Sequence, residues 1–302
     1  MTRRIFDAVL VGGGPANLAA ALTLGRARRR TLLADAGPRR NAAATHVHNF
    51  LTRDGTPPDE MRRIARAQLT PYASVEARDE AVTAIRGERG AFEVELTSGT
   101  VMARRIVLGT GMIDGAVSID GFAERWGHAI FQCPYCHGWE ARDRPWAYLV
   151  TPSAASHMVP FALQALRWTD TLTVLTNGEI EVAEADAARL RARGIRLESA
   201  AVRRLVGPGR TLSSIELVDG SSIACEALFA HPPQRQVPLV QALELELDEA
   251  GYVRVHELRA ETSRAGIFAA GDLTTPGQAA ILAAGAGMRA AAMINMELAL
   301  EG

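Results

Sequence analysis

Residues 8–17, Ala-Val-Leu-Val-Gly-Gly-Gly-Pro-Ala-Asn, combine a short apolar run with a glycine-rich turn and decide the fold. The apolar run is typical of a buried parallel strand. After the turn, residues 15–28 place Leu18 and Leu22 on one helical face, and residues 31–34 form a second apolar run. Strand, turn, helix and strand in this order predict a βαβ unit.

The turn suits a dinucleotide, because a pyrophosphate needs close backbone approach and a helix N-terminus. Gly12 and Gly14 supply the turn and the approach, and Asp35 ends the second strand, where a carboxylate can accept hydrogen bonds from ribose hydroxyls. Asn17 stands at the third position of the usual glycine pattern, which governs helix packing more than phosphate contact. An ordinary glycine turn is the alternative, but strand, helix and acidic residue together favour dinucleotide binding.

Length and charge limit the class of protein. The 302 residues correspond to about two domains, and the formal charge of −1 gives no general attraction to nucleic acid or to an anionic membrane. No apolar run reaches the ~20 residues that a membrane span needs. The first residues lack a signal-peptide cleavage pattern, so a cytoplasmic location without nucleic-acid or membrane partners is expected.

The second chemical signal is the segment 131–140, Phe-Gln-Cys-Pro-Tyr-Cys-His-Gly-Trp-Glu. Two cysteines with this spacing, Cys133 and Cys136, can close a disulfide across one turn, and a thiolate there can have a lowered pKa. A zinc half-site would need two more ligands, and Cys225 is alone and distant in sequence. Haem attachment also uses C-x-x-C-H but requires export. The pattern favours a redox dithiol, and no metal site is predicted.

Three further segments extend the dinucleotide pattern along the chain. Gly12–Ala16, Gly109–Gly111 and Gly266–Asp272 resemble, in order, the FAD-domain signatures of the low-molecular-weight thioredoxin-reductase family. The resemblance covers nearly the whole chain. It implies that FAD is the cofactor and that the active protein is a homodimer.

The resemblance also implies which residues contact FAD. Asp272 would meet the ribityl chain, and Gln278 with Ala279 would precede a helix whose N-terminus faces the isoalloxazine, although Gly277 replaces the family's usual arginine. Asn49 lies in a segment similar to the flavin-contacting loop, and Val82 would lie near the adenine. The implied cofactor site consists of Gly12, Gly14, Pro15, Asp35, Asn49, Val82, Gly111, Asp272, Gln278 and Ala279.

The family assigns different roles to the two cysteines. Cys136 would face the flavin, and Cys133 would react with the external thiol or disulfide. His137 stands where nicotinamide-dependent members usually have an acid, and an imidazole that titrates near neutrality could take a proton from an incoming thiol. A packed or surface histidine is the alternative. His46 and His48 are weaker candidates for a place near the flavin.

The reductases carry a second glycine turn, which binds NADPH. Here the equivalent residues 147–155 contain no glycine, and Pro152 removes a backbone donor. Residues 176–178, Thr-Asn-Gly, stand where basic side chains would read the 2′-phosphate. A helix is expected over residues 154–167. The sequence predicts that the scaffold is kept and NADPH binding is lost, unless a shifted turn binds the nucleotide.

The predicted fold is α/β, with two Rossmann-like, three-layer domains. Residues 1–113 and 243–302 form the FAD-binding domain, and the inserted domain of residues 114–242 bears the dithiol and resembles a degenerate NADPH domain.

Without a nicotinamide donor, electrons must enter elsewhere. The segment from Cys133 to Glu140 is similar to that of the gliotoxin- and holomycin-type dithiol oxidases, which implies oxidation of a small-molecule dithiol. Electrons would pass through the cysteine pair to FAD and then to O2, giving H2O2. The alternatives are a thioredoxin-type reductase fed by ferredoxin or NADPH, and a flavin-loaded sensor without turnover.

Overall fold

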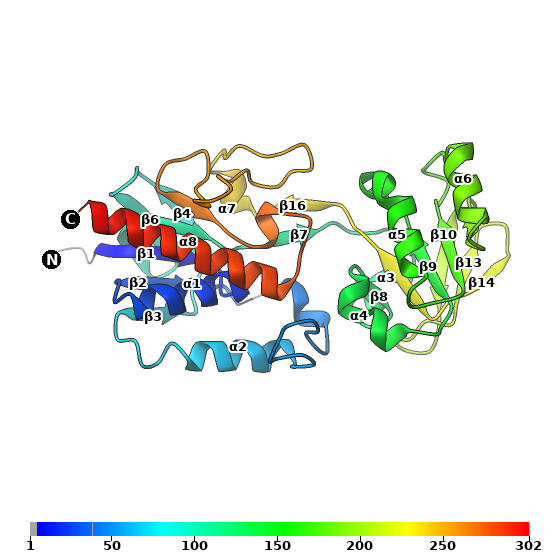
Figure 1. The fold of residues 1–302 in the computed structure, drawn as a ribbon, viewed down its shortest axis with the longest axis horizontal. Helices are drawn as coiled ribbons and strands as arrows, with labels where there is room; N and C mark the ends of the chain where they lie inside the picture. The colour runs from blue at the N-terminus through cyan, green and yellow to red at the C-terminus, as the bar shows by residue number, and fades with distance from the viewer. Residues whose placement is uncertain (1–4, 38, 302) are drawn as a thin grey trace. The chain divides into compact units, whose positions relative to one another are not determined.

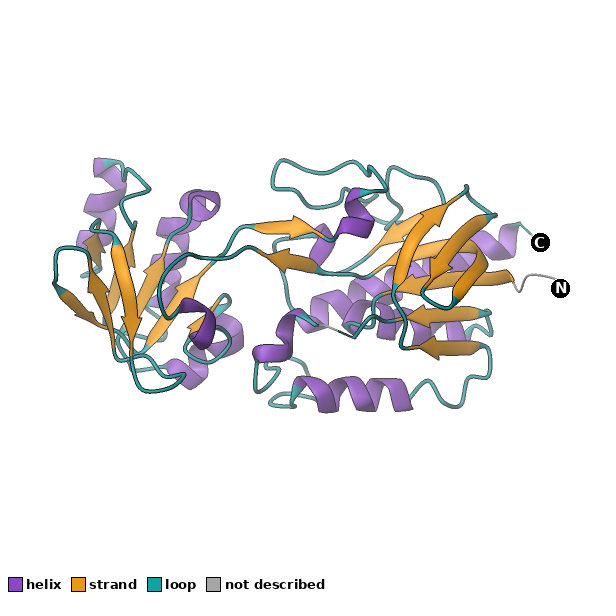
Figure 2. Ribbon diagram, turned by 180° about the vertical axis from the view of Figure 1, so that it is seen from behind, coloured by secondary structure: helices purple, strands orange, loops and turns teal. Residues whose placement is uncertain are grey.

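The computed structural model describes residues 5–37 and 39–301 and divides them into two compact units. The first unit comprises the residues up to Ala42, Phe50–Ile113 and Gln234 onward. The second comprises Ala43–Asn49 and Asp114–Pro233. The chain thus returns to the first unit at Gln234, whereas the sequence prediction placed that boundary after residue 242. The predicted α/β architecture is confirmed, and in Figure 2 each unit has its own strands and helices.

The first unit is built on a seven-stranded sheet. Strands β3, β2, β1, β6 and β17 pair in parallel, and β5 and β4 continue the sheet in antiparallel fashion from the first half of β6. The strands of this unit are β1 Ile5–Val11, β2 Thr31–Ala34, β3 Val75–Arg78, β4 Val82–Arg86, β5 Phe92–Leu96, β6 Gly99–Leu108, β7 Met112–Asp114, β16 Gln234–Gln236 and β17 Ile267–Ala269. Its helices are α1 Pro15–Arg26, α2 Pro58–Ala67, α7 Pro238–Gln241 and α8 Ala280–Leu300, with short 3-10 turns η1 Arg40–Ala43 and η3 Asp272–Thr274.

The side chains of β1 point alternately to the two faces of the sheet, which explains why each face has an apolar cluster. Ala8 and Leu10 pack with α1 and α8, whereas Val9 and Val11 pack with the residues that follow β16. Successive side chains of a strand point to opposite faces, so one continuous apolar run serves both clusters. Figure 1 shows α8 lying along the sheet beside α1.

The second unit contains a five-stranded parallel sheet in the order β11-β10-β9-β15-β8 and a three-stranded antiparallel sheet, β12-β13-β14. Its strands are β8 Ile130–Phe131, β9 Trp146–Leu149, β10 Leu172–Leu175, β11 Arg196–Glu198, β12 Val202–Val206, β13 Ser214–Leu217, β14 Ser222–Ala224 and β15 Ala227–Ala230. Its helices are α3 Phe122–Arg125, α4 Pro134–Ala141, α5 Met158–Ala165 and α6 Glu184–Arg191, with the 3-10 helix η2 Pro152–His157.

The helix expected over residues 154–167 starts late for a simple reason. Pro160 lacks an N–H and its ring would clash with the carbonyl four residues earlier, so it is tolerated only in the first turn of an α-helix. Accordingly α5 begins at Met158, and η2 fills the gap. Over the ranges that the structure describes, no helix is both long and apolar enough to cross a bilayer.

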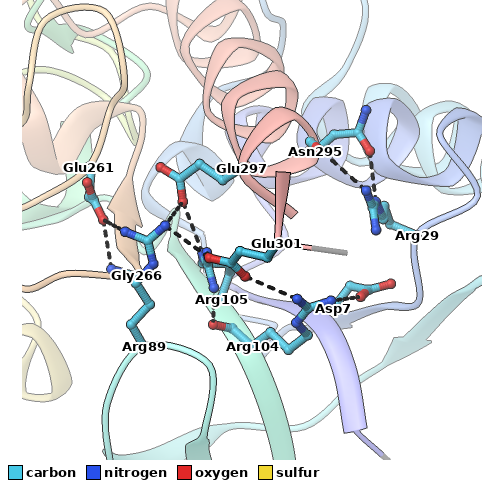
Figure 3. Close-up of polar contacts among 10 residues, drawn as sticks. All are labelled: Asp7, Arg29, Arg89, Arg104, Arg105, Glu261, Gly266, Asn295, Glu297 and Glu301. Atoms are coloured by element: carbon cyan, nitrogen blue, oxygen red, sulfur yellow. Dashed lines mark hydrogen bonds and ion pairs between the residues drawn. The ribbon is translucent and has the colours of Figure 1, made fainter. Parts of the chain in front are cut away.

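An ion-pair network fastens the C-terminal end of α8 to the sheet (Figure 3). Arg105 on β6 is fully buried and contacts Glu297, at 3.1 Å, and Glu301. These two glutamates are one helical turn apart on α8, which brings them to one face. Arg89 contacts both carboxylates and Arg104 contacts that of Glu301, each from a less buried position.

Replacing Arg105 should therefore destabilise the first unit. Arg105→Met leaves the half-buried Glu297 with fewer partners, and we expect the free energy of unfolding to fall by about 1–3 kcal/mol, measured by urea denaturation. Arg104→Met, the adjacent and more exposed control, should cost less than about 1 kcal/mol. Equal losses for the two variants would contradict the central role of Arg105.

Candidate active site

Parallel register brings the three glycine-containing segments of the first unit to one edge of the sheet. Val11 pairs with Leu108, and Leu108 pairs with Ala269. The next residues along each strand, including Gly12 and Gly109, therefore leave the sheet side by side. Ligands of open α/β sheets bind at this carboxyl edge.

The first turn has no room for a side chain. Gly12 adopts a φ of +100°, and a Cβ atom there would stand 2.6 Å from the carbonyl oxygen of Gly109. Gly14 is the N-cap of α1, no side chain caps this helix, and Pro15 occupies its first turn. The N-terminal N–H groups of α1 thus remain available to an anion.

Asn17 explains how the chain manages without the third glycine. Its side chain is fully buried, and its amide nitrogen donates to the carbonyls of Val11 at 2.8 Å and Gly12 at 2.9 Å. A Cβ on Gly109 would stand 2.6 Å from the same amide. Asn17 therefore holds the end of β1 and fills the space beside Gly109, which is the packing role expected of that position.

Asp35 lies at the end of β2 and is 5% exposed. Burial alone would raise the pKa of Asp35, but a hydrogen bond from Arg62, backbone N–H groups of Gly37 and Gly13 and the charge of Arg62 leave the pKa below its usual value. The carboxylate is ionised at neutral pH and can accept hydrogen bonds from ribose hydroxyls. Arg62, on α2, was not singled out from the sequence.

The third segment surrounds Asp272 and the start of α8. Gly271 has a φ of +91°, and Asp272 begins η3. Gln278 and Ala279 follow, and Ala279 is the N-cap of α8, which no side chain caps. A second uncapped helix N-terminus therefore lies in the first unit, where the family resemblance places the isoalloxazine.

The other predicted FAD contacts are more scattered. Gly111 has a φ of +65°, and Val82 begins β4, where it is half-buried against the core. Asn49 adopts a left-handed φ of 59° and belongs to the second unit. Beside Gly111, the hydroxyl of Thr110 is buried and has no hydrogen-bond partner within the described ranges. This orphaned polar atom and the two uncapped helices fit a polar cofactor, so the residues present suit FAD.

The cysteine pair opens α4 in the second unit. Cys133 is the N-cap of the helix, Cys136 lies in its first turn, and both are free thiols that are partly buried. A hydrogen bond from Cys136 and backbone N–H groups of Cys136 and Tyr135 outweigh burial and lower the pKa of Cys133 to about 7. Cys133 is therefore the thiolate of the pair near neutral pH.

His137 sits beside the dithiol in an apolar position. Its ring stacks on Phe131 with centroids 4.3 Å apart, and its buried Nδ1 has no hydrogen-bond partner among the residues described. Burial, and then the charge of His48, lower the pKa of His137 to about 4. The expected titration near neutrality is thus not found: the imidazole is neutral at neutral pH because burial penalises its charged form.

His48 and Glu140 add a polar group that the sequence did not predict. His48 Nε2 lies 3.6 Å from a carboxylate oxygen of Glu140 on α4, and the rings of His46 and His48 are 5.9 Å apart. The segment 43–49 packs within the second unit, where Ala43 approaches the backbone of Gly127. This tertiary contact helps to bring His48 to the dithiol helix.

Side chains fill the turn after β9, the counterpart of the glycine turn in the first unit. Thr151 donates to the carbonyl of His231 at 2.7 Å and shares a hydrogen bond with Ser153 at 3.1 Å. After β10, Asn177 bonds Glu179 and accepts from the N–H of Val202 at 2.7 Å. An acidic side chain thus lies where a 2′-phosphate would need a basic one.

A metal site was the main alternative to a redox dithiol at the cysteines, and the structure bears on it. Cys225 is fully buried, and burial raises the pKa of its thiol to about 12, so it is an inert core residue. Within residues 5–37 and 39–301, no cluster of three or more His, Cys, Asp or Glu side chains could hold a metal ion.

The arrangement of two α/β units, a glycine turn and a C-x-x-C helix defines a class of flavin-type disulfide oxidoreductase. Residues 6–291 match the pyridine nucleotide-disulphide oxidoreductase family, and the chain belongs to it. Its resemblance to thioredoxin reductases is confirmed.

Individual relatives are similar to this chain over nearly its full length. The chain is 31% identical to thioredoxin reductase sirT of Leptosphaeria maculans, with 97% of this chain and 94% of that protein covered. Among solved structures, an oxidoreductase from Agrobacterium tumefaciens has a TM-score of 0.90 at 36% identity and covers 99% of this chain and 100% of its own. HlmI has a TM-score of 0.89 at 34% identity, covering 98% of this chain and 93% of its own.

The hydrogen bond between the cysteines can be tested by alkylation of the reduced protein. Thiolate increases as pH rises through the pKa, so iodoacetamide should modify Cys133 with a midpoint near pH 7. Cys136→Ala removes the S–H donor, and we expect alkylation of Cys133 at pH 7 to slow by about fivefold, measured by peptide mass mapping.

Cys136→Ser keeps a donor and should slow the reaction less than Cys136→Ala. Buried Cys225 should remain unmodified in both folded variants. Equal rates for wild type and Cys136→Ala would show that the helix N–H groups alone stabilise the thiolate.

The glycine turn can be tested by adding one methyl group. Gly12→Ala meets both an unfavourable φ and the Gly109 carbonyl, so we expect the variant to retain FAD at least about tenfold more weakly, measured by equilibrium dialysis. Gly220→Ala has a similar φ of +87° with open space around it and is the matched control. Equal FAD affinity of the two variants would rule out a tight contact at Gly12.

Proposed function

We propose that this protein is an FAD-dependent oxidase that closes a disulfide in a small dithiol and passes the electrons to O2. The observation that carries the proposal is the contrast between two turns. The first unit keeps a glycine turn at a free helix N-terminus, whereas the second unit, which bears the dithiol, has Thr151, Pro152 and Ser153 at the corresponding place.

The physical argument concerns what a second dinucleotide would meet. A pyrophosphate needs backbone N–H groups at a helix start, but η2 stands there, α5 begins only at Met158, and Pro152 has no N–H. Glu179 contributes negative charge near the end of β10, which disfavours a 2′-phosphate, whereas Arg196 at 2.7 Å offsets the charge of the neighbouring Glu198. NADPH is therefore a poor electron donor for this chain, although most of its named relatives are called thioredoxin reductases.

The chain's own groups account for the thiol chemistry. A substrate thiolate attacks Cys133 in the Cys133–Cys136 disulfide, the S–S bond breaks, and Cys136 leaves as a thiolate. The second substrate thiolate then attacks the substrate sulfur of the mixed disulfide, which forms the product disulfide and releases Cys133 as a thiolate. Because a thiol of lower pKa is a better leaving group, the pKa of Cys133 near 7 favours this release.

Bound FAD would supply the two-electron acceptor for the cysteine pair, and reoxidation by O2 with two protons would give H2O2. We propose that His137 binds the incoming thiol as a hydrogen-bond acceptor rather than acting as the base expected from the sequence, because a neutral imidazole beside Cys136 has an unprotonated nitrogen at working pH. A pKa of about 4 makes this imidazole too weak a base to ionise a thiol, so the substrate sulfur must reach Cys133 as a thiolate. The similarity of residues 133–140 to the gliotoxin- and holomycin-type dithiol oxidases supports a natural-product-like substrate.

The test is oxygen consumption by the purified, FAD-loaded protein with dithiothreitol as the probe dithiol. We expect peroxide to be released in a one-to-one ratio with O2 consumed, and Cys133→Ser or Cys136→Ser to lower the rate by at least about 100-fold. Cys225→Ala, which alters a buried cysteine that the proposal does not use, should keep the rate.

Three outcomes would overturn the proposal. Rapid anaerobic bleaching of the flavin by NADPH would make the chain a nucleotide-dependent reductase. Reduction of a protein disulfide by reduced ferredoxin, without turnover of small dithiols, would make it a reductase fed by an electron-transfer protein. A flavin that dithiols reduce but that stays reduced in air would indicate a sensor.

A further inference from the structure

Arg40 contacts two of the residues that the family resemblance assigns to the flavin. Its guanidinium donates to Asp272 at 3.2 Å and to the side-chain oxygen of Gln278 at 2.5 Å. Arg40 lies in η1, far in sequence from both partners, and its side chain is 21% exposed. A mostly buried cation therefore stands at the start of α8, within the first unit.

A hydrogen-bonded group fixes the position of this cation. Gln278 and Gln234 exchange hydrogen bonds of 2.8 and 3.0 Å through their side-chain amides, and Tyr252 donates to Gln234 at 3.1 Å. These contacts orient the oxygen of Gln278 toward Arg40. The guanidinium is thus held on two sides, which lowers the entropy that it loses when it binds a third partner.

Gly277 is the reason to ask whether Arg40 supplies the positive charge of the flavin site. In the family an arginine usually precedes the Gln-Ala pair, and here that position has no side chain. Space does not explain the glycine, because a Cβ at Gly277 would meet only Thr275 Oγ1 at 3.4 Å and a Leu282 methyl at 3.9 Å. The chain thus lacks a positive charge at position 277, and Arg40 brings one to Gln278 from another segment.

We propose that Arg40 is the cation of the flavin site, held by Asp272 and Gln278 so that it stabilises negative charge on the reduced ring. The inference rests on the proposed binding of FAD. Asp272 offsets part of the charge of Arg40, and the part that remains acts more strongly in a partly desolvated site than it would in water. Together with the uncapped N-terminus of α8, Arg40 would favour reduction of the flavin by the dithiol.

Sulfite is a direct probe, because it adds to oxidised flavins and leaves negative charge on the ring. We expect Arg40→Gln to weaken sulfite binding at least about tenfold and to lower the two-electron reduction potential by about 30 mV, the equivalent of a tenfold change. Arg40→Lys keeps the charge and should retain most of both. Arg63→Gln, which removes an exposed charge on α2, should change neither.

Each outcome bears on the role of Arg40 separately from the oxidase proposal. Arg40→Gln that binds FAD with unchanged sulfite affinity and potential would overturn this role while wild-type turnover stands. If folded Arg40→Gln, checked by circular dichroism, releases FAD, then Arg40→Lys decides: retained FAD and sulfite binding support the charge, and equal loss of FAD overturns it. Wild type that never binds FAD would instead defeat the proposed function.

Discussion

Close approach of backbone to backbone at the carboxyl edge of the first sheet is the constraint on which the cofactor site depends. Gly12 lies against the carbonyl of Gly109, with no space for a Cβ. Gly287 of α8 lies even more tightly against the carbonyl of Ala16, since a Cβ there would overlap that oxygen, and this contact holds α8 against the start of α1. The parallel register of β1, β6 and β17 makes these contacts possible, because it aligns the residues that leave the sheet. A side chain at Gly12 or Gly287 would separate elements that must meet for two helix N-termini to face one ligand.

The second unit has the same kind of parallel sheet without a close backbone approach at a glycine turn. Its parallel sheet is as well packed, with Trp146, Tyr148 and Phe229 buried at its centre. That core requires apolar strands, but it does not require glycine after β9. Threonine, proline and serine can therefore occupy the turn without loss of fold, since Thr151 bonds His231 and ties the ends of β9 and β15 together. Fold and nucleotide binding are separable because they depend on different residues of the same βαβ pattern.

Local patterns predicted the elements of this chain well, and tertiary contacts account for what they missed. The run from Ala8 to Asn17 is sufficient for β1, the glycine turn and α1, because strand, turn and helix signals coincide there. The late start of α5 follows from Pro160, a signal present in the sequence but not weighed. The contacts of Arg62 with Asp35, Arg40 with Asp272 and His48 with Glu140 join segments far apart in sequence, and no periodicity reports them. The pKa of His137 likewise depends on Phe131 and on burial, which a motif alone does not reveal.

Asymmetry between the two active cysteines gives the thiol chemistry an order. The surroundings of a cysteine decide the pKa of its thiol. The start of α4 and the S–H of Cys136 lower the pKa of Cys133, whereas burial raises the pKa of Cys225, which takes no part in the proposed chemistry. Cys136 donates to Cys133, so the negative charge of the reduced pair resides mainly on the sulfur that must leave the substrate. In the proposed oxidation of a dithiol, release of the oxidised product would then be favoured over accumulation of the mixed disulfide. His137 adds no charge of its own at neutral pH, so it does not compete for that thiolate. The reduced pair therefore carries one negative charge, and in the proposed mechanism this anion would donate two electrons to a flavin whose negative charge after reduction Arg40 would stabilise.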